Sequence, residues 1–211
     1  MLAGEPYRAD DAELVSDRRH CQEILRNFNN RPEQELLTSG LGRIFGSVGE
    51  KTFIETPFIC DYGYNISIGT DSFINYGGVV LDVAPVTIGD QVRIATGVHI
   101  VTAEHPLDPA ERRAGVELAR PVTIGDGVWI GSGAVICPGV TIGENSVIGA
   151  GSIVTGDIEA GVLAVGNPCR VVRKPGPPTA FRSAEKHDAE EGQVEPDPDR
   201  DRDLAELRLA P

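Results

Sequence analysis

An aliphatic residue recurs at every sixth position over much of the chain. The longest unbroken series is Ile124, Ile130, Ile136, Ile142, Ile148 and Val154, and shorter ones are Ile88, Ile94, Ile100 and Ile68, Ile74, Val80. A period of six fits neither the helical repeat of about 3.6 residues nor the alternation of a long strand. It fits a chain that turns a corner every six residues and points one side chain per flat face inward. The pattern therefore predicts a mainly β protein, a parallel β-helix with three faces.

The repeat is interrupted at two places. From Val80 to Ile88 the spacing is eight residues, which predicts a bulge near Asp82. From Ile100 to Ile124 the pattern lapses, and segment 102–121 is rich in proline and charge. Because such a segment cannot supply inward aliphatic side chains, we expect a long loop extruded from one corner. Long loops on a regular scaffold often carry function.

The flanking segments lack the repeat. Residues 12–28 have apolar side chains at helical spacing after the capping candidates Asp10 and Asp11, and Pro32 begins a second helical pattern that ends near Gly40. We expect both helices to cap the open first coil and shield its strand edge. The predicted organisation is a helical region at 1–55, a β-helix domain at 56–173 and a tail at 174–211. The charged, proline-bearing tail is predicted to be disordered.

Composition narrows the picture further. Aromatic residues make up only 5% of the chain, as expected for a narrow coil filled with Ile and Val, and the net charge of −13 argues against binding to nucleic acid or anionic membranes. No segment approaches transmembrane length, and the N-terminus lacks an apolar signal core. The four cysteines are scattered without a CxxC pair, at Cys21, Cys60, Cys137 and Cys169. We therefore expect a reduced, cytoplasmic protein.

Several long strings follow one another in a fixed order: MLAGEPY, PFICDYGYNISIG, FINYGGVVLDVAPVTIGD, TAEHPLDPAERRAGVELARPVTIGDGVWIG, PGVTIGENSVIGAGSIVT and GNPCRVVR. From Met1 to about Arg173 the chain resembles the hexapeptide-repeat acyltransferases, above all the maltose and galactoside O-acetyltransferases, and the MLAG and LDVAPV strings favour the maltose type. The resemblance implies a left-handed parallel β-helix, an exception to the usual right-handed crossover. It also implies a homotrimer with active sites between neighbouring coils, and transfer of an acetyl group from acetyl-CoA to a sugar hydroxyl without a metal.

Acyl transfer from a thioester to an alcohol requires a base for the hydroxyl proton, donors for the oxyanion and a slot for CoA. The chain has four histidines, at His20, His99, His105 and His187. His105 lies in the interrupted segment and matches the family's catalytic histidine, so the resemblance implies that it is the general base. An imidazole suits this task near neutral pH. Glu104 and Glu117 either orient the ring or are solvated loop charges.

The acceptor site is expected from three positions. By resemblance Asn75, Asp82 and Asp61 contact the sugar, although an asparagine such as Asn75 also suits a tight corner for structural reasons alone. The N-terminal Tyr7, Asp10 and Asp11 are further candidates to line the pocket, and the sequence does not choose among them.

The CoA slot is expected along the second half of the coil. The resemblance assigns to it Ser132, Ala150, Thr155, Trp129, Arg170 and Arg173, with the two arginines meeting the CoA phosphates. The small residues among these are equally expected in any hexapeptide corner. Gly156 lies in the same slot where the family usually carries lysine, so we expect weaker CoA binding than in lysine-bearing relatives.

Other activities occur on the same scaffold. The γ-class carbonic anhydrases need three histidines on zinc, whereas only His99 and His105 lie in the coil region. Acyltransferases for serine, amino sugars or other small alcohols and amines, and a non-catalytic trimeric scaffold, are the remaining alternatives. The sequence thus predicts an acetyl-CoA-dependent sugar O-acetyltransferase, with maltose or glucose as the expected acceptor and copies of itself as the expected protein partner.

Overall fold

The computed structural model describes residues 1–2, 4–30 and 41–173. The second predicted helix, up to Gly40, and the tail at 174–211 lie outside the described residues. The described residues belong to one compact unit, Met1–Pro175.

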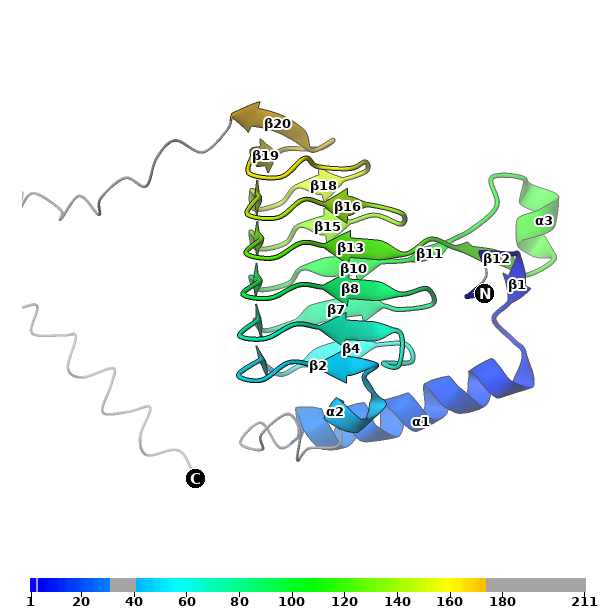
Figure 1. Ribbon diagram of the computed structural model, residues 1–211. Coiled ribbons are helices and arrows are strands. Elements are labelled where there is room, and N and C mark those ends of the chain that lie inside the picture. Colours follow the sequence, from blue (N-terminus) through cyan, green and yellow to red (C-terminus); the bar gives the residue numbers. More distant parts are fainter. Residues whose placement is uncertain (3, 31–40, 174–211) are drawn as a thin grey trace, which may run out of the picture. The chain divides into compact units, whose positions relative to one another are not determined.

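The body of this unit is a coil with three flat faces (Figure 1). Face I consists of β2 (Ser47–Val48), β5 (Ile66–Ile68), β8 (Val86–Ile88), β13 (Val122–Ile124) and β16 (Thr141–Ile142). Face II consists of β3 (Phe53–Ile54), β6 (Phe73–Ile74), β9 (Arg93–Ile94), β14 (Trp129–Ile130), β17 (Val147–Ile148), β19 (Leu163–Val165) and the antiparallel end strand β20 (Arg170–Arg173). Face III consists of β4 (Phe58–Cys60), β7 (Gly78–Leu81), β10 (His99–Val101), β15 (Val135–Ile136) and β18 (Ile153–Val154). The chain visits the faces in this order, and the predicted left-handed parallel β-helix is confirmed.

The inward residues of the six-residue repeat form the core. Ile88 pairs in register with Ile68 and Ile124, and Ile124 pairs with Ile142, so each face stacks aliphatic side chains in a column. All of these side chains are at most 2% exposed. The glycine after many of them is a steric requirement, because a Cβ at Gly125 would lie 2.7 Å from the backbone nitrogen of Glu144 in the next coil. The six-residue sequence pattern therefore follows from the close stacking of successive coils.

All changes in coil length fall on one edge. Ile68 and Ile88 are paired neighbours 20 residues apart, whereas Ile124 and Ile142 are 18 apart. The extra residues lie between face III and face I, in 61–65 and 82–85, and the long insertion 102–121 leaves from the same edge. The expected bulge at Asp82 thus has an unpredicted counterpart after Cys60. We call the line of segments 61–65, 82–85, 102–121, 137–140 and 155–157 edge III–I.

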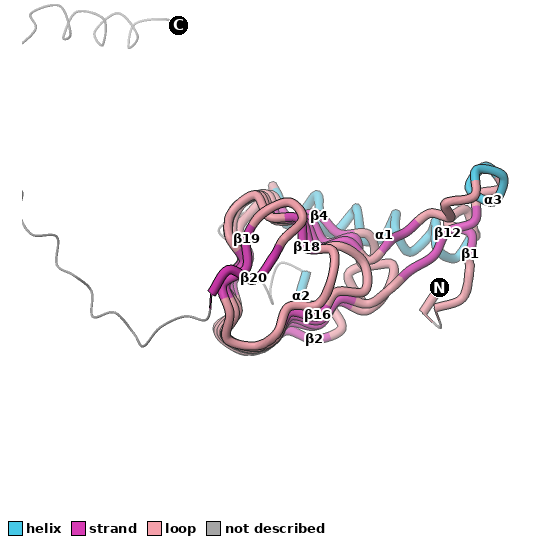
Figure 2. Tube along the Cα trace, turned by 90° about the horizontal axis from the view of Figure 1, so that it is seen from above, coloured by secondary structure: helices cyan, strands magenta, loops and turns pink. Residues whose placement is uncertain are grey.

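The extruded loop is more ordered than expected. It contains β11 (Ala103–Glu104), the short helix α3 (Pro109–Arg113) and β12 (Val116–Ala119). The N-terminal strand β1 (Tyr7–Arg8) pairs antiparallel with β12, which completes a three-stranded sheet that projects from edge III–I (Figure 2). A small apolar cluster roots this sheet on the coil, formed by Tyr62, Val83, Ala84 and Ala119 with Met1, Tyr7, Leu14 and Ala103.

Helix α1 (Ala12–Asn29) covers the first coil, as expected (Figure 1). Asp11 is its N-cap and accepts a hydrogen bond from the Glu13 N–H at 2.9 Å. Cys21, Leu25 and Phe28 are buried in the coil's core cluster. At the open strand edge the Asn29 amide donates to the Phe58 carbonyl and accepts from the Phe58 N–H, both at 2.9 Å.

The coil begins earlier than the sequence indicates. Strands β2 and β3 belong to faces I and II, although both lie within the segment 1–55 expected to be a separate helical region. The short helix α2 (Leu41–Ile44) leads directly into β2. The first coil was hard to recognise because its core also carries the aromatic residues Phe45 and Phe58, which interrupt the run of Ile and Val.

Candidate active site

Asp82 is a fully buried carboxylate on edge III–I. Its side chain is 0% exposed, and its Oδ1 accepts hydrogen bonds from the backbone N–H groups of Asp61, at 3.0 Å, and Tyr62, at 2.9 Å. Its Oδ2 is buried without a hydrogen-bond partner in the described part of the chain. A buried polar atom left unpaired is costly, so Asp82 lowers the folding stability of this corner.

The environment of Asp82 disfavours its charged form. Burial raises the pKa of the Asp82 carboxyl to about 6, the two backbone N–H bonds oppose this rise, and the nearby Asp61 adds to it. Burial likewise raises the pKa of Asp61, against the opposing effect of Arg18, and Glu117 raises it further. The two predicted acceptor carboxylates therefore lie close together in a partly dehydrated corner.

The N-terminal strand and the loop close this corner. The Tyr7 hydroxyl donates to Glu117 Oε2 at 2.8 Å, and desolvation followed by this hydrogen bond raises the pKa of Tyr7. Arg18 of α1 donates to the Tyr62 hydroxyl and to the Ala9 carbonyl, and its guanidinium lies 5.6 Å from the Tyr62 ring centre. Of the N-terminal candidates, Tyr7 is thus in this neighbourhood, while Asp10 pairs with Arg8 and Asp11 caps α1.

His105 follows β11 directly, at the base of the extruded loop, and is exposed. The preceding Glu104 makes two hydrogen bonds to Arg120, at 2.7 and 2.5 Å, across the base of the loop. Arg120 also lies against Gly139 of the next coil. The two carboxylates considered for orienting His105 are therefore occupied elsewhere, Glu104 with Arg120 and Glu117 with Tyr7. The Glu104–Arg120 pair instead fixes the backbone from which His105 projects.

The predicted site residues do not all share one edge. Asn75, Ser132 and Ala150 lie on the edge between faces II and III, which we call edge II–III. Asn75 also has a structural task there, because its Oδ1 accepts from the Tyr76 N–H at 2.7 Å. Trp129 points outward from face II and is 55% exposed. One copy of the chain thus carries two groups of candidate residues, separated by face III.

The residues expected to meet the CoA phosphates lie at the last coil. A cavity of about 350 Å³ is lined by Thr155, Gly156, Asp157, Ile158, Cys169, Arg170 and Val171. Arg173 is exposed on the same strand as Arg170, the end strand β20. A Cβ added at Gly156 would meet nothing within 4 Å, so the position is open toward this space. The exposed guanidinium of Arg170 beside an open cavity fits a phosphate-bearing ligand, whereas Arg173 is not among the residues that line the cavity.

Sequence reasoning missed Tyr62, Arg18 and Arg120. The signal for Tyr62 was present, because Cys60 and Ile68 are eight residues apart, as Val80 and Ile88 are. Arg18 and Arg120 act through partners distant in sequence, and no local pattern marks them. Among the described residues no three His, Cys, Asp or Glu side chains are arranged to hold a metal ion. No described helix is both long and apolar enough to cross a membrane.

Comparisons with known proteins agree with this architecture. Residues 1–49 match the maltose acetyltransferase hexapeptide capping motif, and residues 121–156 match the bacterial transferase hexapeptide (six repeats). Nodulation protein L of Rhizobium meliloti is 51% identical over 81% of this chain and 94% of its own length.

Two solved structures are similar over most of the chain. A maltose O-acetyltransferase from Clostridium difficile 630 has a TM-score of 0.80 and 49% identity, covering 83% of this chain and 95% of its own. A galactoside acetyltransferase in complex with coenzyme A has a TM-score of 0.78 and 42% identity, covering 82% and 87%.

The raised pKa of Asp82 makes stability depend on pH. The folded-state pKa of about 6 lies above the ordinary aspartate value of 3.8, so between these values the folded state holds more protons and the free energy of unfolding falls as pH rises. A difference of about 2 pKa units corresponds to about 3 kcal/mol. We expect Asp82→Asn to gain about 3 kcal/mol relative to the wild type between pH 4 and pH 8, measured by urea unfolding without ligand. A difference between the two proteins that does not change with pH would contradict the assignment.

Proposed function

The chain belongs to the maltose and galactoside O-acetyltransferase family and is an acetyl-CoA-dependent O-acetyltransferase, and we propose that its acceptor is a maltose- or glucose-type sugar activated by His105 as general base. The names of similar proteins, a maltose O-acetyltransferase and a galactoside acetyltransferase among them, support a sugar acceptor. The MLAG and LDVAPV strings support the maltose type.

One observation carries the proposal. The only long insertion in the described coil leaves from the edge that holds Asp61 and Asp82, and its base presents the exposed imidazole of His105. A sugar hydroxyl is a neutral, weakly acidic nucleophile that needs both a base and partners for its neighbouring hydroxyls. The half-buried carboxylate of Asp61 is an acceptor for such a hydroxyl, and the buried Asp82 holds the backbone of Asp61 and Tyr62 in place.

The reaction follows from these groups. The neutral His105 imidazole takes the proton from the attacking sugar hydroxyl as the oxygen adds to the thioester carbonyl of acetyl-CoA. Collapse of the tetrahedral intermediate breaks the carbon–sulfur bond, and the His105 imidazolium returns the proton to the departing CoA thiolate. The products are the O-acetyl sugar and free CoA, and His105 is neutral again. Asp61, Asp82 and Asn75 hold the acceptor in this scheme, and Ser132, Ala150, Trp129, Thr155, Arg170 and Arg173 hold CoA.

We further propose a homotrimer in which neighbouring copies complete each site. Asn75, Ser132 and Ala150 on edge II–III lie across face III from the Asp82 and His105 groups on edge III–I. A heterologous contact that joins edge II–III of one copy to edge III–I of the next closes as a ring of three. Each copy then contributes to two sites.

The outward side chains of the faces support this assembly. Face I presents the short polar residues Ser47, Ser67, Thr87, Thr123 and Thr141. Face III presents a mostly apolar column of Ile59, Val79, His99, Val135 and Ile153, in which Ile59 is 46% exposed. An apolar face between two incomplete sites is suited to contact another copy. Location in the cytoplasm stays a prediction from the sequence.

Removal of the proposed base should abolish most of the activity. We expect His105→Ala to lower kcat for sugar-dependent CoA release by roughly 10²–10⁴-fold, or about 3–5 kcal/mol of transition-state stabilisation. The matched control is Leu107→Ala in the same loop, where the side chain is 96% exposed and removal should change kcat less than about twofold. Activity in the His105→Ala enzyme comparable to that of the control would refute the proposed base.

The glycine at position 156 should limit CoA affinity. Because a side chain there meets open space beside Arg170, Gly156→Lys should fold normally and add a cation near the phosphates. An exposed charge pair is worth about 0.5–1 kcal/mol, so we expect the CoA dissociation constant to fall about two- to fivefold by calorimetry. Gly156→Gln supplies similar length without charge and should give no gain. Equal affinities for the lysine and glutamine variants would contradict an electrostatic role.

A further inference from the structure

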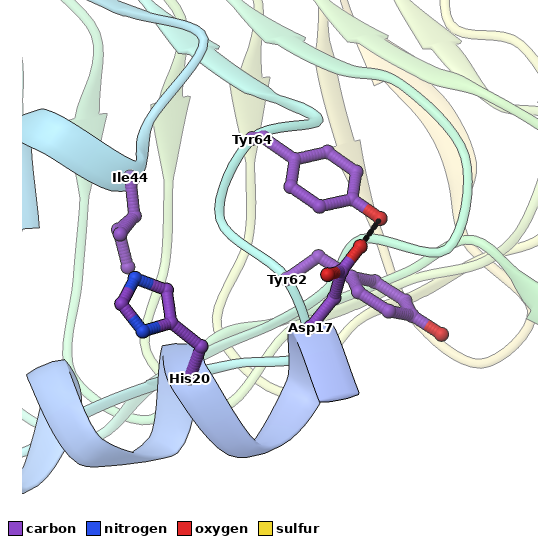
Figure 3. A pocket seen from close by; sticks show the side chains of 5 residues that line it. All are labelled: Asp17, His20, Ile44, Tyr62 and Tyr64. Carbon is purple, nitrogen blue, oxygen red and sulfur yellow. Dashed lines mark hydrogen bonds between the residues drawn. The ribbon is translucent and has the colours of Figure 1, made fainter. Parts of the chain in front are cut away.

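A second cavity lies below the first coil, outside the residues assigned to the acceptor and to CoA. It has a volume of about 210 Å³ and is lined by Asp17, His20, Ile44, Tyr62 and Tyr64 (Figure 3). Asp17 and His20 come from helix α1, Ile44 from α2, and the two tyrosines from the corner 61–65 of edge III–I. The cavity thus exists because this corner is two residues longer than a regular one.

The lining combines aromatic and polar groups. The rings of Tyr62 and Tyr64 have centres 5.4 Å apart, and Tyr64 is 41% exposed. The Tyr64 hydroxyl donates to Asp17 Oδ2 at 3.2 Å, while His20 and Ile44 lie on the other side of the cavity (Figure 3). Tyrosine offers an apolar face and a polar tip, and the carboxylate and imidazole exchange hydrogen bonds with hydroxyls. A pyranose ring has the same two characters, an apolar C–H face and a rim of hydroxyls.

The size of the cavity favours a single ring. Sites for drug-sized ligands have volumes of roughly 300–1,000 Å³, and this cavity falls below that range. Tyr62 is only 2% exposed, and Arg18 holds its hydroxyl, so this wall of the cavity is preformed. A preformed wall reduces the entropy lost on binding.

Tyr62 connects the cavity to the proposed acceptor site. Its backbone N–H donates to Asp82 Oδ1 at 2.9 Å, whereas its side chain lines the cavity. Asp61, which precedes Tyr62 in the same corner, is half-buried, so the accessible acceptor carboxylate and the aromatic wall of the cavity belong to neighbouring residues.

We propose that this cavity is a second sugar subsite, which holds the further pyranose ring of a disaccharide acceptor while the reacting ring lies at Asp61 and Asp82. The inference rests on the proposed function and deepens it, because it makes a disaccharide the better substrate than a single hexose.

The test compares two acceptors in the wild type and four variants. In Tyr64→Ala and Asp17→Asn, kcat/KM for maltose should fall about tenfold, while kcat/KM for glucose changes less than about twofold. Tyr64→Phe keeps the ring and should retain most of the maltose activity. Glu23→Gln removes an exposed carboxylate from the same helix and should change neither value. Equal losses for maltose and glucose in the Tyr64 and Asp17 variants, or no loss with either sugar, would overturn the subsite.

Failure of the subsite and failure of the proposed function give different results. If the wild type acetylates neither sugar, the acceptor proposal is wrong. Calorimetric titration with maltose then tests sugar binding at the cavity independently of activity. Binding by the wild type that Tyr64→Ala loses would still support a sugar site. Absence of maltose binding, or equal binding by both proteins, would refute it. Thermal unfolding of each variant identifies any loss that comes from misfolding.

Discussion

The register of the inward aliphatic columns is the constraint on which the rest of the structure depends. Each Ile or Val must lie over its counterpart in the preceding coil, so a residue can be added only where the chain leaves one face for the next. Edges II–III and I–II keep their regular length in the described coils, and edge III–I takes the insertions. Asp61, Asp82 and the proposed base His105 therefore lie where the protein departs from its repeat. Asn75, Ser132 and Ala150 lie on the regular edge II–III.

The lengthened corner of edge III–I also explains why the carboxyl group of Asp82 is buried and has a raised pKa. A lengthened corner lets the backbone of Asp61 and Tyr62 turn toward Asp82, which removes that carboxylate from water yet satisfies only one of its oxygens. The loop and the N-terminal strand then exclude water through the contact of Tyr7 with Glu117. A dehydrated carboxylate with one unpaired oxygen lowers the folding stability.

Much of the fold could be predicted from spacing alone, because a six-residue period allows few structures. The interruption of the six-residue repeat after Ile100 predicted the extruded loop. The resemblance to the acyltransferase family pointed to His105 as the base. The sequence could not reveal that Tyr7 pairs with Glu117, that Asn29 completes the edge of the strand at Phe58, or that Arg120 holds Glu104. These contacts join residues far apart in the chain through side chains with no periodic pattern. The split of the candidate residues between two edges became visible only when the strands were assigned to faces.

Each active site is proposed to need residues from two copies of the chain, and complementation tests this most directly. His105→Ala and Asn75→Ala chains are each expected to be nearly inactive, and they are to be co-expressed with different tags and assayed after isolation of the mixed assembly. Every isolated mixed trimer contains both chains and has one intact site of three, so about a third of the wild-type activity should return. Activity no higher than that of the single variants would show that His105 and Asn75 act within the same copy, and would contradict the account.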